Sequence, residues 1–196
     1  IPGLAAAAAR NKSLQRRDIS IFEIGTCFFP TAKGALPLER MKLGAAITGQ
    51  RSDTHWSLRA QEVDFYDIKG LAEALVPGIT VRLSDHAFYK PGHQADILLD
   101  GKAVGHMGAL GADILAMIDV TDEVFALEMD ADVLLKRTFK GLQEIPKFPM
   151  TWRDLSLVAD ETVPYADILA VIEGLRIKEL KAVTAVDLYT GEKLAP

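Results

Sequence analysis

The sequence contains a single cysteine, Cys27, among its 196 residues. One cysteine cannot form an internal disulfide, and such sparse usage is typical of a reducing cytoplasm. No apolar run approaches the ~20 residues that a transmembrane helix needs. The short run at residues 4–9 follows no basic start, as a secretory signal would require. We therefore expect a cytoplasmic protein without a membrane partner.

Familiar motifs of nucleotide binding and hydrolysis are also missing: no GxxxxGK, GxSxG, CxxC or HExxH occurs. Gly105, Gly108 and Gly111 have GxxGxxG spacing, which is not the dinucleotide fingerprint, and we interpret them as turn and close-packing glycines. The histidines never pair at i,i+4 or near the cysteine, so surface or loop positions are favoured over metal binding. They are His55, His86, His93 and His106.

The overall charge is −5, which argues against a strong, purely electrostatic polyanion binder. Hydrophobic residues make up 49% of the chain, enough for one core, or one core and a small second module. The first residue is not Met and lies in an expected helix, so we interpret the sequence as a piece of a larger protein.

The N-terminal part predicts a helix over residues 3–12, rich in alanine, and strands over 19–29 and 41–49, the second antiparallel to the first. In the first strand, one face carries Phe22, Ile24 and Phe28. The other face also holds apolar residues, so the pattern favours a central position in a sheet.

A helix is predicted after Asp64, with Asp64 as N-cap and Asp67 at the third position. Its apolar stripe is Phe65, Ile68, Leu71, Ala72 and Leu75. Asp100-Gly101, between two apolar runs, predicts a tight hairpin turn.

A short helix from about Gly111, a strand over Val124–Met129 and a short helix through Leu135 follow. Helices interspersed with antiparallel strands indicate an α+β fold, a largely antiparallel sheet with flanking helices. Glu128, Asp130 and Asp132 could be imagined as a metal site, but alternate residues that end a strand and cap a helix explain them better.

Beyond a linker with Pro and Gly, residues 153–159 predict a strand, 164–175 a helix and 182–189 a second strand. These elements form one βαβ unit, which is too short for a complete domain.

Several segments carry a family resemblance. They are IPGLAAAAARN, DISIFEIGTCF, LGAAITG, VDFYDIKGLAEAL, YKPGHQADILLDGKAVGHMGALG, VFALEMDADVLL, KFPMTWRDLSLV and VDLYTGE. In their order and spacing, the chain resembles the C-terminal region of the β subunit of bacterial phenylalanyl-tRNA synthetases.

The resemblance implies a catalytic-like class II synthetase module at residues 1–139, incomplete at its N-terminus. A linker at 140–146 and the first half of a ferredoxin-like anticodon-binding domain at 147–196 follow. Active class II enzymes hold ATP with two arginines, whose cationic charge stabilises phosphate. Here Phe29 and Pro30 take the first position, and Met129–Leu134 offers carboxylates at the second, so we expect the fold without the catalysis.

The family further implies association with the catalytic α subunit in an (αβ)2 ligase, and contact with the anticodon region of tRNA-Phe. The parent complex uses ATP and Mg, whereas no cofactor is expected in this fragment. The isolated chain is expected to self-associate through the apolar surface that would contact its partner. The candidate nucleic-acid-binding residues, basic or aromatic, are Lys147, Phe148, Trp152, Arg153, Lys178, Lys181 and Tyr189.

Alternatives remain at this stage. For each lysine, plain solvation competes with RNA contact, and Arg153 could instead pair with Asp154. Trp56 and Trp152 could be core or interface residues. The chain could also be a free-standing RNA-binding or protein-interaction module, or an independent enzyme that uses Asp64, Asp67 and a histidine, although no nucleophile or metal constellation accompanies them.

Overall fold

A computed structural model describes residues 1–53, 55–135 and 148–190. The chain divides into two compact units, Ile1–Gly141 and Leu142–Pro196, called here the N-terminal and C-terminal units. Each is described by itself. The predicted linker at 140–146 and Lys147 lie outside the described residues.

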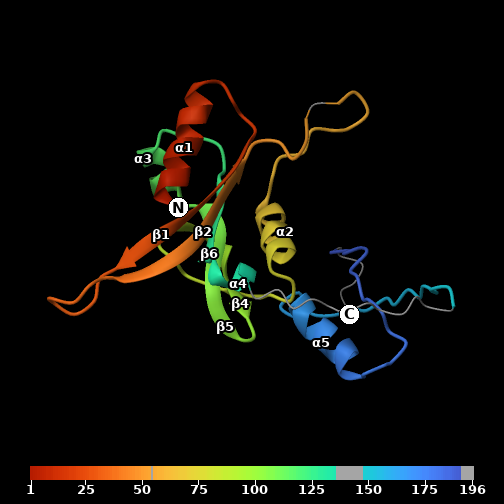
Figure 1. Ribbon diagram of the computed structural model, residues 1–196. Helices are drawn as coiled ribbons and strands as arrows, with labels where there is room; N and C mark the ends of the chain where they lie inside the picture. The colour runs from red at the N-terminus through yellow and green to blue at the C-terminus, as the bar shows by residue number, and fades with distance from the viewer. Residues whose placement is uncertain (54, 136–147, 191–196) are drawn as a thin grey trace. The chain divides into compact units, whose positions relative to one another are not determined.

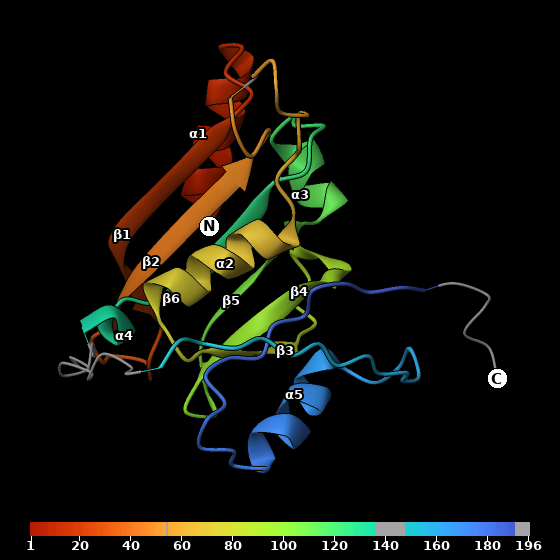
Figure 2. The same cartoon turned by 90° about the vertical axis from the view of Figure 1, so that its right-hand side faces the viewer.

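The N-terminal unit is built on a six-stranded sheet in the order β1-β2-β6-β5-β4-β3, with every pair antiparallel (Figures 1 and 2). This confirms the α+β class. The strands are β1 (Ile19–Phe29), β2 (Leu38–Thr48), β3 (Thr80–Leu83), β4 (Tyr89–Leu99), β5 (Lys102–Leu110) and β6 (Phe125–Asp130).

Helices cover both faces of this sheet (Figures 1 and 2). The helices are α1 (Pro2–Ser13), α2 (Phe65–Leu75), α3 (Ala112–Met117) and α4 (Asp132–Leu135). On one face α2 packs against the inner strands, in a core that includes Ile68, Ile97 and Leu127. On the other face α1 and α3 supply a second core around Leu4 and Tyr89.

The start of α2 is fixed by a local hydrogen-bond pattern. The Asp64 side chain accepts from the backbone N–H of Tyr66 and Asp67, and the Asp67 side chain accepts from the Asp64 N–H, which completes a capping box. Ile68 and Ala72 of the predicted stripe are fully buried. The helix, its cap and its buried face are therefore confirmed.

The β4–β5 hairpin turns at Asp100 and Gly101, with φ of 51° and 74°. These are the left-handed conformations that the Asp-Gly pair predicted. Within β5, a Cβ on Gly108 would lie 2.8 Å from the Tyr89 ring. Close packing is thus confirmed for this glycine of the GxxGxxG series.

The prediction that β1 is a central strand was wrong, because β1 is the outermost strand of the sheet. Its Phe22, Ile24 and Phe28 do share a face, as their register with β2 requires, but all three are exposed. An apolar pattern on both faces of a strand indicates which side chains favour burial. It does not indicate whether this unit itself buries them.

In the C-terminal unit, helix α5 (Tyr165–Gly174) confirms the predicted helix, with Pro164 as its N-cap. The strands expected at 153–159 and 182–189 are not formed, since neither segment pairs with another strand. A split βαβ unit leaves a gap between its parallel strands that another strand must fill. No described segment fills it, so neither strand has a ladder. No helix in the described parts of the chain is long and apolar enough to cross a membrane.

Candidate partner and nucleic-acid interfaces

The two positions expected to have lost their arginines lie at the ends of β1 and β6, which are separated in the sheet by β2. Phe29 ends β1, while Asp130 ends β6 just before α4. Lys42 of β2 lies between the two strands, because it is directly opposite Gly25 on β1 and Asp130 on β6.

The Lys42 side chain is occupied by contacts within the unit. Its Nζ lies 2.8 Å from Asp130 Oδ1 and 5.9 Å from the centre of the Phe29 ring. The Lys42 cation is therefore paired. Phe29 takes the position at which active class II enzymes have a phosphate-binding arginine. These residues do not fit a triphosphate with its Mg. Sequence reasoning missed Lys42, because only the register of β2 with β1 and β6 places it here.

Farther along the same face lies a cluster of polar side chains. The Tyr89 hydroxyl lies 3.1 Å from Nδ1 of His106 and donates to the Ala126 carbonyl oxygen at 3.2 Å. Next to it, His86 Nε2 is 3.0 Å from Asp96 Oδ1, and the two imidazole ring centres are 4.8 Å apart. Arg82 Nη2 completes the cluster, 2.8 Å from Asp96 Oδ2.

Burial shifts the pKa of two members of this cluster, Tyr89 and His106. It raises the pKa of the Tyr89 hydroxyl well above its usual value, with a further contribution from the nearby Glu128 carboxylate. It lowers the pKa of His106, although Glu128 acts in the opposite direction. A surface or loop position was thus wrong for His106, a half-buried residue of β5. The strand pattern around it was the available signal.

Because its folded-state pKa is depressed from 6.5, His106 is expected to make stability depend on pH. Below pH 6.5 the unfolded chain binds a proton that the folded unit resists, so this stabilisation is present above pH 6.5 and decreases as the pH falls. When the pH is lowered from 7.5 to 5, the Tm measured by thermal unfolding should decrease less for His106→Gln than for the original chain. The matched control, His93→Gln at an exposed site, should behave as the original chain does. Equal pH profiles for all three proteins would contradict this.

An apolar surface lies on the outer strands of the sheet. We call it the β1 strip; it consists of Phe22, Ile24, Phe28 and Met41. Ile24 and Phe22 are opposite Leu43 and Ala45, which belong to the core that α2 covers. The strip therefore continues this apolar face beyond the reach of α2, and Phe22 is 73% exposed. Trp56 is 93% exposed, which excludes a core position in this unit.

The residues predicted to contact RNA lie on the surface of the C-terminal unit where the structure describes them. Phe148, Trp152 and Tyr189 are exposed, as a base-stacking role requires. Arg153 Nη1 donates to the Trp152 carbonyl oxygen at 2.9 Å; in the described residues it has no ion pair with Asp154.

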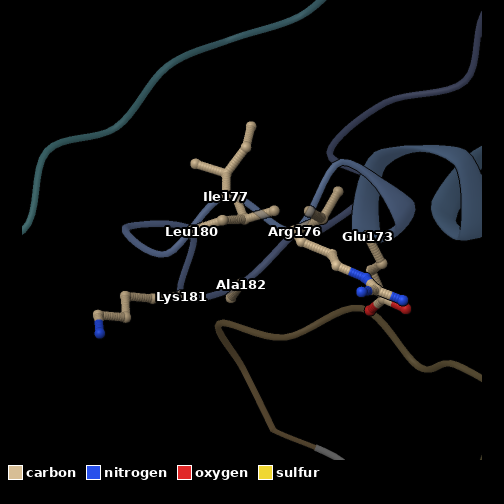
Figure 3. A pocket seen from close by; sticks show the side chains of 7 residues that line it. Glu173, Arg176, Ile177, Leu180, Lys181 and Ala182 are labelled. Carbon is tan, nitrogen blue, oxygen red and sulfur yellow. The ribbon is translucent and has the colours of Figure 1, made fainter.

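Helix α5 and the turn after it line a small pocket of about 180 Å³ (Figure 3). Lys181 and Arg176 both contribute, but the Arg176 guanidinium is directed toward Glu173 and the Lys181 ammonium points away from both. The two cations thus do not converge on one anion. Sequence reasoning missed Arg176; Lys178, also exposed, does not line the pocket.

Other candidate chemistry finds structural explanations. Asp64 and Asp67 form the α2 cap, and Arg51 Nε lies 2.9 Å from Asp67 Oδ1. Despite partial desolvation, the hydrogen bond from Arg51 lowers the pKa of Asp67. Over residues 1–53, 55–135 and 148–190, no three His, Cys, Asp or Glu side chains are grouped as a metal site would need.

Two family models match the sequence. The model described as "Phenylalanyl tRNA synthetase beta chain CLM domain" matches residues 1–131. The model described as "Ferredoxin-fold anticodon binding domain" matches residues 146–196. Together they account for nearly the whole chain.

Curated relatives give the same result. The chain is 32% identical over 203 residues to the phenylalanine–tRNA ligase beta subunit of Shewanella oneidensis, covering 99% of this chain and 25% of that protein. It is 33% identical over 200 residues to the same subunit of Geobacter sulfurreducens, covering 97% of this chain and 25% of the relative. The chain thus spans about a quarter of the length of these relatives.

A pyrrolysyl-tRNA synthetase from Desulfitobacterium hafniense has a similar structure, with a TM-score of 0.50 and 20% sequence identity. The similarity covers 68% of this chain and 46% of that chain. At this identity it bears on the fold alone, which is that of a synthetase.

Proposed function

Because this chain belongs to the phenylalanyl-tRNA synthetase β-chain family, we propose that it is a non-catalytic part of the β subunit of phenylalanine–tRNA ligase. It supports aminoacylation of tRNA-Phe by associating with the catalytic α subunit and by contacting the anticodon region of the tRNA. The parent complex is an ATP-dependent cytoplasmic ligase, an (αβ)2 heterotetramer that uses Mg.

One observation carries this proposal: the N-terminal unit keeps an ordered synthetase-like sheet, yet Lys42, the cation beside Phe29, is paired with Asp130. A sheet that no longer holds ATP but presents the exposed β1 strip is suited to binding a protein. The same surface accounts for self-association of the isolated chain.

The α subunit is the expected partner of the β1 strip. Immobilised α subunit should capture the full chain, and the double variant Phe28→Glu/Met41→Glu should bind at least about tenfold more weakly, because two apolar side chains that the proposed interface would bury become charged. Surface plasmon resonance measures both affinities.

The matched control is Leu83→Glu, an exposed apolar residue on β3 at the opposite edge of the sheet. It should bind the α subunit as the unmodified chain does. If the unmodified chain is not captured, the partner role is wrong; if both variants weaken binding equally, the β1 strip is not the surface.

Contact with tRNA is proposed for the C-terminal unit at residues 147–196, after a linker at 140–146 and a synthetase-like unit at 1–139. From Lys140 to Pro196 there are 7 basic and 9 acidic residues, a net charge of −2. A net negative charge provides little non-specific attraction to phosphate, so the contact rests on local stacking and a few cations.

Filter binding with tRNA-Phe at moderate salt should therefore show only weak affinity for this chain, with Kd above the micromolar range. Trp152→Ala should weaken it by about five- to a hundredfold, the usual range for one stacked base. Lys178→Ala and Lys181→Ala should instead reduce the salt dependence. The control Val171→Ala alters an exposed side chain of α5 and should change neither. Sub-micromolar, anticodon-dependent binding, or no effect of Trp152→Ala, would contradict this assignment.

A further inference from the structure

The loop between β2 and α2 extends beyond the end of the sheet (Figures 1 and 2). Its two ends are held together by four residues, which we call the neck: Gln50, Arg51, Gln61 and Glu62. An isolated antiparallel bridge joins Gln50 to Glu62, and the Arg51 N–H donates to the Gln61 carbonyl oxygen at 2.8 Å. A compact surface loop whose ends are close in this way is an Ω-loop, a kind of loop that frequently carries function.

The side chain of Arg51 joins the neck to α2. Its Nε lies 2.9 Å from Asp67 Oδ1, and its Nη2 lies 3.0 Å from Asp67 Oδ2 and 3.2 Å from Asp64 Oδ2. Nη1 donates to Gln61 Oε1 at 3.1 Å, on the returning end of the loop. All three guanidinium nitrogens are thus used, and a planar fork that contacts one carboxylate through two nitrogens has a defined orientation.

The two carboxylates benefit from this cation because the α2 capping box brings them together. Asp67 Oδ2 accepts from the Asp64 N–H at 2.8 Å, and Asp64 Oδ1 accepts from the Asp67 N–H at 3.2 Å. Like charges at one place repel each other, and a shared arginine offsets that repulsion. Single exposed ion pairs contribute little to stability, but a bidentate arginine within a network is an exception. The neck and the helix cap therefore stabilise each other.

The segment held by the neck carries a large apolar side chain in water. Trp56 is 93% exposed, and Leu58 is 61% exposed. The ring centre of His55 lies 5.6 Å from that of Trp56, and His55 Nδ1 lies 2.8 Å from Ser57 Oγ. Tryptophan is enriched among residues that contribute most to binding, and a segment that is already ordered loses less entropy when it binds. A fixed neck therefore affects how this indole is presented.

We propose that Arg51 is a latch, which holds the neck of this loop on the capping box of α2 and so presents Trp56 in one orientation. With the latch closed, the neck and the first turn of α2 move as one unit. With the latch open, the loop moves on the nanosecond to microsecond timescale of surface loops, and the cap of α2 is weakened. This device goes beyond the proposed function and depends neither on the α subunit nor on tRNA.

Fluorescence tests whether Arg51 orients the loop. In a Trp152→Phe background, Trp56 is the one remaining tryptophan of the chain. Time-resolved anisotropy then measures how far its indole moves within nanoseconds in the folded protein. Arg51→Gln should increase the amplitude of the fast component, and Arg51→Lys, which keeps the charge but loses the planar fork, should give an intermediate value. High salt, which screens exposed ion pairs, should increase this amplitude in the original chain and leave Arg51→Gln unchanged.

Hydrogen exchange tests whether the neck opens. Beside the neck, the Val63 N–H donates to the Gly49 carbonyl oxygen at 2.9 Å. Arg51→Gln should make this amide exchange roughly two- to thirtyfold faster, the range that corresponds to the loss of two exposed ion pairs. The matched control is Arg59→Gln, which removes an exposed arginine of the same loop that is outside the latch. It should change neither the exchange of Val63 nor the anisotropy of Trp56.

The outcomes separate a latch from a merely structural ion pair. Faster exchange of Val63 with an unchanged anisotropy of Trp56 would mean that Arg51 stabilises the unit without orienting the loop, and the latch would be wrong. It would also be wrong if Arg51→Gln changed neither quantity, or if Arg59→Gln changed both to the same extent. Circular dichroism confirms that each variant is folded.

Discussion

Replacement of Gly105 by alanine is expected to destabilise the N-terminal unit by about 3 kcal/mol or more, the upper part of the range for overpacking. A Cβ at this position of β5 would lie 2.4 Å from the Glu128 carbonyl oxygen and 2.6 Å from Met129 Cβ. Directly opposed residues normally keep their Cβ atoms about 4.5–5.5 Å apart. The obstacle includes backbone of the adjacent strand β6, which cannot rotate away.

Differential scanning calorimetry should show a decrease in Tm of roughly 6–12 °C for this change. The matched control is Gly70→Ala in α2, where a Cβ would meet nothing within 4 Å. Because alanine has a higher helix propensity than glycine, the control should raise stability by up to about 1 kcal/mol. If Gly105→Ala is neutral, β5 and β6 are not packed as closely as described.

Truncation of Ile68 to alanine should have a comparably large effect, about 2–5 kcal/mol. Ile68 is fully buried in the core between α2 and the sheet. Its loss would leave a cavity beneath the centre of the helix, where strands on one side and α2 on the other limit collapse. Urea unfolding, with the m value compared between variants, measures the change.

The matched control lies on the opposite face of the same helix: Tyr66 is 75% exposed, and its truncation to alanine should cost less than about 1 kcal/mol. If Tyr66→Ala proved more destabilising than Ile68→Ala, α2 would be rotated relative to its described position, and the continuation of its apolar face into the β1 strip would no longer hold.

The proposed loss of catalysis rests on the side chains that meet at the ends of β1 and β6. Phe29 takes a position where active class II enzymes have an arginine, so one cation is lost there. This replacement is visible in the sequence. The positive charge of Lys42 is paired with Asp130, and this pairing depends on the alignment of β2 with β6. The pairing of Lys42 thus supports our proposal that the unit binds partners and does not activate an amino acid.

The sequence by itself determined the features that arise from neighbouring residues. The capping box of Asp64, the positive φ of the turn at Asp100-Gly101 and the apolar stripe of α2 each depend on a few consecutive side chains, so propensity and periodicity predicted them. Family membership was also accessible, because ordered segments along the whole chain carry it. The domain limits at 139 and 147 remain predictions.

The tertiary structure alone decided what depends on distant partners. Whether β1 is central or at the edge, whether His106 is buried against Tyr89, and where Lys42 finds its anion are set by strands that meet only after folding. The segments at 153–159 and 182–189 show the same dependence, since a strand needs a neighbour's backbone hydrogen bonds whereas helix α5 supplies its own.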